Sequence, residues 1–181
     1  MVNGSTISAK APMTSTLTAG LLLGVLCGVW TFVMGFTGWY KDPGKTSASL
    51  VIVAIEIAVL LWGLGRTAVK ERRTYSGQVV AGTLMSITGG IVIIGFSLLF
   101  TTVFFPNYFN DMQPVYRDLL QKQGMPEAEI ATAMAEWSAG QSSLRQAVGQ
   151  FLFTFVTGVV VSAVLAIWVR ARPASHVARS T

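Results

Sequence analysis

One apolar stretch, residues 47–64 (SASLVIVAIEIAVLLWGL), constrains the fold of this chain more than any other. It is long enough to cross a bilayer, and it carries Glu56 at its midpoint. A charged acid at that depth costs about 2.5–3.5 kcal/mol even on a translocon insertion scale, so Glu56 cannot face lipid. We therefore expect other helices to pack around this side chain and to shield it from the hydrocarbon.

The chain has far fewer charges than a soluble protein of its size. Only 12% of its 181 residues are charged, whereas soluble domains carry about 25%. The deficit is concentrated in four apolar runs of membrane-spanning length, at residues 17–39, 47–64, 77–105 and 143–169. Because backbone polar groups must be satisfied within the hydrocarbon, helices are the expected spanning form. The sequence predicts an all-α, polytopic membrane protein with four transmembrane helices.

The rest of the chain is short. Residues 1–16 are rich in Ser, Thr and Ala, which predicts a flexible N-terminal segment, and residues 173–181 form a C-terminal tail. The apolar region of a cleaved signal peptide has only about 7–15 residues, so we expect the longer first run to be retained. This leaves a single membrane domain over residues 17–172, which includes an extramembrane segment at 106–141.

Basic residues are more numerous on one side of the predicted bundle. The N-terminal segment, residues 65–76 and the C-terminal tail share that side and hold eight Lys and Arg, against five on the other. The positive-inside rule then places both termini in the cytoplasm. Anionic lipid headgroups would attract the arginines by about 1 kcal/mol each, although topology alone would also produce this cluster. Its arginines are Arg66, Arg72, Arg73, Arg170 and Arg172.

The segment 106–141 predicts a helical hairpin that rests on the membrane or on a partner. Asp111 is the expected N-cap of its first helix, Gly124 the left-handed C′ residue, and Pro126 the first residue of the second helix. Residues 143–146 (SLRQ) have the form of a capping box and mark the start of the fourth membrane helix. Both hairpin helices have an apolar face at helical spacing, formed by Met112, Val115, Tyr116, Leu119 and Leu120 and by Ile130, Met134 and Trp137.

Glu56 is the residue with the clearest functional potential. By depth in the membrane, we expect Thr31, Thr88 and Thr157 near it, and no Lys, Arg or His lies at that level. Without a counter-charge the neutral, protonated acid is the expected form. Three interpretations stay open: a proton or cation site, a structural acid bonded to a threonine or a carbonyl, and a contact with a charged helix of another subunit.

Small residues form a ridge in the first apolar run. Gly20, Gly24 and Gly28 recur every four residues and therefore share one face of the helix. Such a ridge lets the backbone of another helix approach closely. It predicts packing inside the bundle or, alternatively, homodimerisation or docking to another membrane protein.

Several classes of function lack their usual residues in this sequence. Cys27 is the single cysteine and His176 the single histidine, which excludes an intrachain disulfide and histidine ligation of a haem inside the membrane. No metalloprotease, nucleophile-elbow or phosphate-loop motif is present, and the basic residues are not interleaved with aromatic ones as in nucleic-acid binding. We expect no catalytic residue, no metal, no cofactor and no nucleic-acid partner.

Three short motifs are similar to those of a known family. They are residues 75–78 (YSGQ), 106–108 (PNY) and 124–130 (GMPEAEI). With the four apolar runs, they resemble a bacterial membrane family catalogued as domain of unknown function 4199, over residues 17–172. The resemblance implies an all-helical protein of the bacterial inner membrane, and it brings no known catalytic residues.

Two functional hypotheses follow. The first is a non-enzymatic accessory or scaffold subunit that docks other membrane proteins, or forms a homo-oligomer, through the glycine ridge or the hairpin. The second is a small proton-coupled transporter or channel that uses Glu56. A water-filled path to Glu56 would favour transport, and a dry contact with a threonine would favour the scaffold.

Overall fold

The structure, a computed structural model, describes residues 11–71 and 74–170. Within these ranges the chain is helical and contains no strand. The long helices are α1 (Ala11–Phe36), α2 (Leu50–Glu71), α3 (Tyr75–Leu99) and α6 (Ser143–Arg170). Two shorter helices, α4 (Tyr108–Lys122) and α5 (Glu127–Gly140), lie between α3 and α6, and the short helical turns are η1 (Trp39–Lys41), η2 (Pro43–Ser49) and η3 (Phe100–Phe104).

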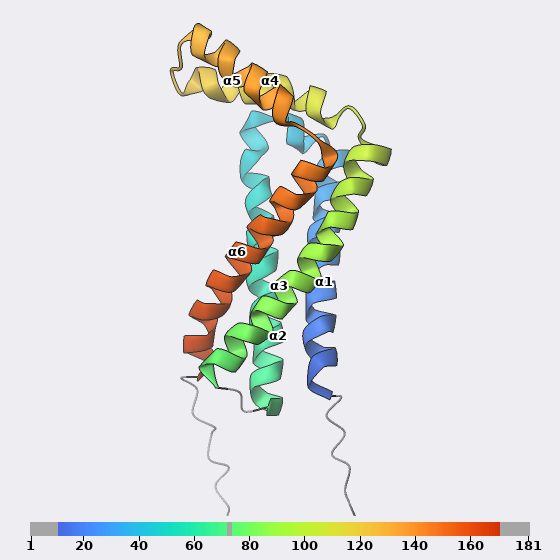
Figure 1. Cartoon of the computed structure of the whole chain (residues 1–181), viewed down its shortest axis with the longest axis vertical. Coiled ribbons are helices and arrows are strands. Elements are labelled where there is room, and N and C mark those ends of the chain that lie inside the picture. Colours follow the sequence, from blue (N-terminus) through green and yellow to red (C-terminus); the bar gives the residue numbers. More distant parts are fainter. Residues whose placement is uncertain (1–10, 72–73, 171–181) are drawn as a thin grey trace, which may run out of the picture.

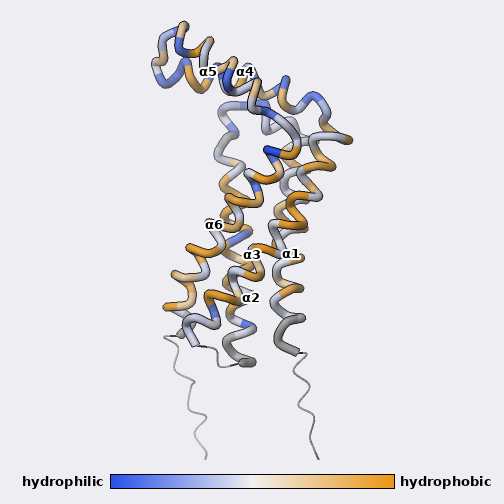
Figure 2. The backbone as a smooth tube through the Cα atoms, in the orientation of Figure 1, coloured by the Kyte–Doolittle hydropathy of each residue, from blue (hydrophilic) through white to orange (hydrophobic). Residues whose placement is uncertain are grey.

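Four helical segments in the described ranges are long and apolar enough to span a membrane. They form one bundle, with the start of α1 and the end of α6 at one end and α4 and α5 at the other (Figure 1). We call these the terminal end and the hairpin end. Apolar residues run along the bundle and polar residues gather at the hairpin (Figure 2). The prediction of four transmembrane helices and an extramembrane helical hairpin is confirmed.

The four helices are not equivalent, because α3 is central. It packs along most of its length against both α1 and α6, whereas α2 lies between α1 and α6 and makes fewer contacts with α3. Gly20, Gly24 and Gly28 all face α3. A Cβ on Gly20 would lie 2.6 Å from the carbonyl oxygen of Met85, so the glycine ridge packs helices of the same bundle.

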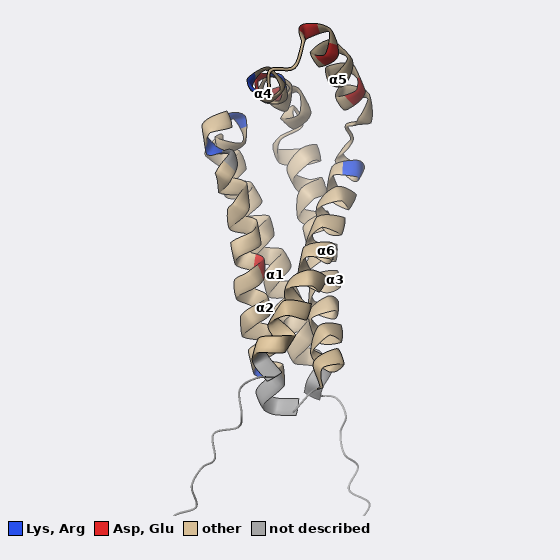
Figure 3. Ribbon diagram, turned by 90° about the vertical axis from the view of Figure 1, so that its left-hand side faces the viewer, with Lys and Arg blue, Asp and Glu red and all other residues tan. Residues whose placement is uncertain are grey.

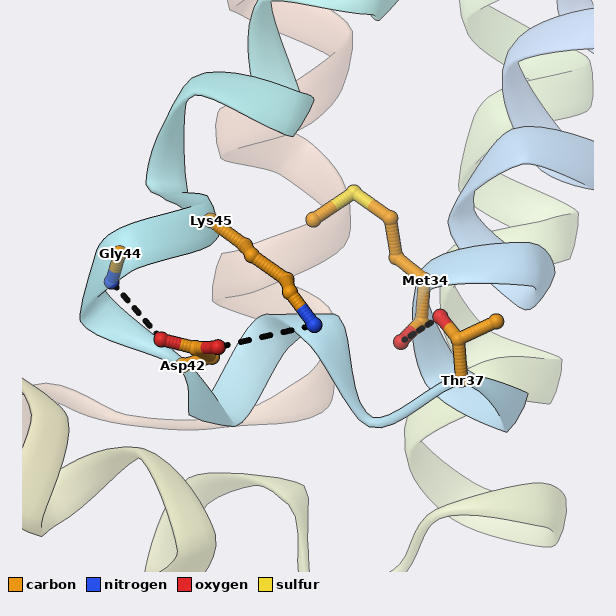
Figure 4. Close-up of polar contacts among 5 residues, drawn as sticks. All are labelled: Met34, Thr37, Asp42, Gly44 and Lys45. Atoms are coloured by element: carbon orange, nitrogen blue, oxygen red, sulfur yellow. Dashed lines mark hydrogen bonds and ion pairs between the residues drawn. The ribbon is translucent and has the colours of Figure 1, made fainter.

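The connection between α1 and α2 differs from the predicted boundaries. Helix α1 starts at Ala11, within the segment expected to be flexible, and ends at Phe36, after which Gly38 adopts a φ of 69°. The following turns, η1 and η2, come before α2, and Asp42 caps η2 by accepting a hydrogen bond from the Gly44 amide at 2.9 Å (Figure 4). The same carboxylate lies 3.7 Å from Lys45 Nζ. The predicted second crossing therefore starts as a tight turn and becomes α-helical only at Leu50.

Helix α3 ends in a wider turn. It continues directly into η3, a π-helical turn in which the Phe105 amide donates to the Phe100 carbonyl oxygen at 2.8 Å. The helical segment stops before Pro106, as predicted, because proline has no amide to continue the hydrogen-bond pattern.

Two of the predicted helix caps were wrong. Asp111 lies in the first turn of α4 rather than at its N-cap, because the helix already begins at Tyr108. The start of α6 is capped by Ser142, whose hydroxyl accepts from the Arg145 amide at 3.2 Å, and not by a box that starts at Ser143. Gly124 has the predicted left-handed backbone with a φ of 75°, and Pro126 lies just before α5 instead of within it.

The apolar faces of α4 and α5 cover each other. Leu120 and Ile130 are buried between the two helices, and the rings of Tyr116 and Trp137 stack with their centroids 5.5 Å apart. Leu119 is the exception on the predicted faces, since 48% of its surface is exposed. The hairpin thus buries its own apolar residues to a large extent.

Candidate functional site

Glu56 is buried inside the bundle, as its sequence position required. Only 1% of its surface is exposed, and it faces α3 and α6. Figure 3 shows the charged residues at the two ends of the bundle, apart from one acidic position halfway along it. Its Oε2 atom lies 2.7 Å from Thr157 Oγ1, and its Oε1 atom has no hydrogen-bond partner among the described residues.

The contacts of Thr157 fit a protonated Glu56. Thr157 Oγ1 lies 2.7 Å from Glu56 Oε2 and also 2.7 Å from the carbonyl oxygen of Phe153. A threonine hydroxyl has one proton and can donate it to only one of these acceptors. If Glu56 is protonated, it donates to Thr157 and Thr157 donates to Phe153, so both contacts are satisfied.

The second carboxyl oxygen points to the contact between α3 and α6. A Cβ on Gly158 would overlap Ser86 Oγ and would lie 3.0 Å from Glu56 Oε1. Ser86 donates its proton to the Gly82 carbonyl oxygen at 3.0 Å, which leaves it no proton for Glu56. Ser162 packs on Gly82 in the same way, and its hydroxyl is a second buried group with no partner in the described structure.

A cavity begins about one helical turn from Glu56 on the hairpin side. This lower chamber has a volume of about 320 Å³, and its floor includes Cys27, Val53 and Thr154. Val53 is three residues from Glu56, and Thr154 is three residues from Thr157, which corresponds to about 4.5 Å along each helix axis.

A second cavity continues toward the hairpin end. This upper chamber has a volume of about 220 Å³ and is lined by Tyr40, Phe100 and Tyr108, among others. The two chambers share lining residues from α1, α6 and the start of α2, so we treat them as one outer cavity. The shared residues are Thr31, Ser49, Ile52, Gln146 and Gln150.

The terminal side of Glu56 is closed. Leu60, Leu64, Ala81 and Met85 have no exposed surface and form a continuous apolar cluster with Ala19. The acid therefore lies at the boundary between a closely packed half of the bundle and a half that contains a cavity with both apolar and polar lining residues.

An ionic contact joins the hairpin to the bundle beside the upper chamber. Asp111 of α4 accepts a hydrogen bond from Tyr40 Oη at 2.8 Å and lies 2.7 Å from Lys41 Nζ. These two donors, Lys41 first, hold the pKa of Asp111 below its ordinary value. The same carboxylate raises the pKa of Lys41, and desolvation together with the bond to Asp111 raises that of Tyr40.

The three threonines that were predicted to lie near Glu56 occupy three different places in the structure. Thr157 contacts Glu56 directly, whereas Thr31 lines the outer cavity and donates to the Cys27 carbonyl oxygen at 3.0 Å. Thr88 is not near Glu56, because its hydroxyl donates to Leu84 and its Cβ faces Gly20 of α1.

Little of the predicted basic cluster can be compared with the structure. Arg66 lies over the ring of Trp62, with 4.9 Å between the guanidinium carbon and the ring centroid. Arg72, Arg73 and Arg172 and the side chain of Arg170 fall outside the described part of the chain.

Sequence reasoning missed Gln146, Gln150 and Ser162, which share one face of α6 with Thr154 and Gly158 at a spacing of four residues. Gln146, Gln150 and Thr154 line the cavity, Gly158 lies beside Glu56, and Ser162 packs on Gly82 of α3. This spacing was visible in the sequence and indicates a polar, small-residue stripe in a membrane helix. Ser97 had no comparable signal. It lines the upper chamber, and its buried hydroxyl has no partner in the described residues.

The comparison with known families covers nearly all of this architecture. No curated protein and no solved structure matches the chain. The sequence model of a family described as "Protein of unknown function (DUF4199)" matches residues 18–171, from the first membrane helix to the last. This match includes Glu56, the outer cavity and the hairpin. The chain belongs to the DUF4199 family.

Proposed function

We propose that the protein is a small proton-coupled membrane transporter in which Glu56 accepts and releases the proton. The observation that carries this proposal is the position of Glu56. It is fully buried, one of its oxygens has no hydrogen-bond partner among the described residues, and it lies about one turn below a cavity whose largely apolar lining includes hydroxyl and amide groups. Buried acids without a counter-charge in membrane proteins commonly belong to proton or ion pathways.

The asymmetry of the bundle supports a transporter rather than an open channel. The cavity reaches from the hairpin end to the level of Thr154, and the apolar cluster around Leu60 and Met85 closes the other half. Buried polar groups also lie in that half, but Ser162 packs on Gly82 and Gln78 accepts a hydrogen bond from Thr67 at 3.2 Å, whereas a continuous pore would need open space there. Alternating access, in which α2 shifts against its neighbours, is consistent with one closed half and one hollow half.

The accessory or scaffold role receives less support from the packing. The glycine ridge faces α3, and the apolar faces of the hairpin cover each other. Contacts within the chain therefore already occupy both the glycine ridge and most of the apolar faces of the hairpin, whereas docking to a partner would need an uncovered surface. The role stays a prediction, and a stoichiometric partner after purification in mild detergent would support it.

The orientation is also part of the proposal. With both termini in the cytoplasm of a bacterium, the outer cavity would open on the opposite side of the inner membrane. Proton entry would then run from that side toward Glu56, in the direction of the usual proton gradient.

Proton flux into liposomes tests the proposal. We expect purified protein to collapse an imposed pH gradient when a mixture of small cationic, anionic and neutral organic solutes is supplied, measured with an entrapped pH-sensitive dye, and Glu56→Gln to abolish this flux. Glu129→Gln is the matched control, because Glu129 is an exposed acid of α5 and the same substitution there removes one charge outside the bundle. Equal flux with Glu56→Gln and with the unmodified protein, or no flux from either, would refute the proposal.

A further inference from the structure

We propose that the outer cavity binds an organic ammonium ion and that Glu56 supplies its counter-charge. This inference rests on the proposed function, because it names the class of solute that would exchange with the proton. The cavity is defined by the lower chamber of about 320 Å³ and the upper chamber of about 220 Å³. A bare metal ion would leave most of this space unfilled, whereas a small amine with an apolar body fits it.

The lining of the cavity disfavours an anion. None of the residues that line the two chambers, all of them within the described ranges, is Lys, Arg or His. An anionic solute would therefore lose its hydration without gaining a positive partner. The hydrogen-bonding groups are neutral amides and hydroxyls, such as those of Gln146, Gln150 and Ser49, which can solvate the N–H groups of an amine.

Aromatic rings favour a cation in the upper chamber. Tyr108 lies between Phe100 and Tyr40, with ring centroids 5.4 Å and 5.3 Å away. All three side chains line this chamber. Such a wall attracts an ammonium group through the negative faces of the rings, and it packs against the apolar part of the same molecule.

The titratable groups around the cavity leave Glu56 as the counter-charge, because Asp111, the acid beside the upper chamber, is already paired with Lys41 and Tyr40. Cys27 reaches the floor from α1, and Tyr40 and Tyr108 line the hairpin end. Within the described residues, α3 and α6 add no titratable side chain to the lining, and Arg145 of α6 binds the Gly140 carbonyl oxygen instead. Glu56 is therefore the acid closest to the cavity floor.

The exchange balances in charge. The protonated carboxyl group of Glu56 releases its proton to the outer solution when the ammonium ion enters the lower chamber. The resulting carboxylate no longer donates to Thr157 and turns its negative charge to the cation. One positive charge enters and one leaves, so the binding step is electroneutral.

Calorimetric titration of the purified protein in uncharged detergent tests the inference. We use benzylammonium as the cation, because it has the N–H groups that the amides and hydroxyls of the cavity would accept, and benzylsulfonate as an anion of similar size. We expect the cation to bind at least about tenfold more tightly than the anion, and to release close to one proton per bound ion when titrations in buffers of different ionisation enthalpy are compared. Glu56→Gln should remove the proton release and weaken the cation about tenfold or more, whereas Glu129→Gln should change neither.

The result separates this inference from the proposed function. Proton flux that depends on Glu56, without binding of the organic cation, would overturn the inference and leave the proposed function standing. Binding that depends on Glu56, without any flux, would overturn the proposed function and leave a cation-binding protein. Equal affinity for cation and anion would overturn the inference in either case.

Discussion

The two halves of the bundle, divided at the level of Glu56, differ in how closely α2 approaches its neighbours. In the terminal half, Gly63 brings α2 against α1 and α3, where its Cβ would lie 3.0 Å from the Cβ of Ala19. In the hairpin half, Ile52 and Val53 face the outer cavity, and α2 contributes no glycine there. The same helix is thus closely packed on one side of the acid, whereas on the other it borders a cavity and keeps contact through Ile52 and Ile55, which pack on Leu23, Cys27 and Ile93.

This difference shows what holds a membrane bundle together. Lipid is as apolar as leucine, so close packing of small residues and satisfied polar contacts replace the hydrophobic effect. On α3, Gly82 and Gly89 provide such packing toward α6 and α1. The hairpin half of α2 is held by Ile52 and Ile55, which pack on the cluster around Leu23, and η2 before it is held by the bond from Trp30 Nε1 to the Ala48 carbonyl oxygen at 3.0 Å. We infer that this half of α2 is the part best able to move.

The largest expected effect is the loss of stability when one apolar side chain is truncated on each side of Glu56. Leu60→Ala leaves a hole in a fully packed cluster and should lower the free energy of unfolding by about 2 kcal/mol or more. Ile52→Ala truncates a half-buried side chain that borders the cavity and also packs on the buried cluster around Leu23, so it should cost about half as much. Denaturant unfolding in a fixed detergent measures both. Similar losses for the two variants would mean that the hairpin half is as closely packed as the terminal half.

A smaller effect is expected from adding one methyl group to a glycine. Gly20→Ala places a Cβ 2.6 Å from the backbone oxygen of Met85, which cannot move without shifting α3, so we expect a loss of about 1–3 kcal/mol. Gly95→Ala is the control on α3, because a Cβ there meets nothing within 4 Å. Helix propensity then makes the control neutral or up to about 1 kcal/mol more stable. If both variants unfold alike, the ridge does not set the distance between α1 and α3.

Physical reasoning on the sequence could predict the features that depend on the depth of a residue in the membrane and on the spacing of residues along a helix. The cost of a charge in hydrocarbon was enough to predict that Glu56 is buried, and the depth of Thr157 in its own helix was enough to predict their contact. Depth alone also selected Thr88, which faces α1 instead, because depth does not give the rotation of a helix about its axis. Gln146, Gln150 and Thr154 recur every four residues, and this spacing would have shown which face of α6 turns toward the inside of the bundle.

The cavity could not be predicted in the same way. Its volume depends on the distance between α2 and α6, which results from contacts made elsewhere in the bundle. Asp111 shows the same limit on a smaller scale. Its local sequence suggested a helix cap, but Tyr40 and Lys41, about seventy residues earlier in the chain, use the carboxylate for a tertiary contact.

The smallest expected effect concerns the contact of Asp111 with Tyr40 and Lys41, which joins the hairpin to the bundle. Asp111→Asn removes the partner of Lys41 and weakens the bond from Tyr40, so we expect faster amide hydrogen exchange in the first turns of α4. Unfolding of the bundle should not change measurably, because the pair is exposed to solvent. Asp118→Asn is the matched control. It removes a carboxylate whose partner, Lys122, lies on the same helix at 2.7 Å, and should leave the attachment of the hairpin unchanged.

The pH dependence of this exchange sharpens the test. Because the pKa of Asp111 is lowered in the folded protein, the contact is fully present above the ordinary aspartate range and is lost as the pH falls through the lowered value. The pKa values of Lys41 and Tyr40 are raised, so their contribution is lost only as the pH rises through those raised values. Protection of α4, corrected for intrinsic exchange, should therefore be constant between about pH 5 and 9. A step inside this window would mean that a different group, such as Glu56 acting through the cavity, controls how the hairpin sits on the bundle.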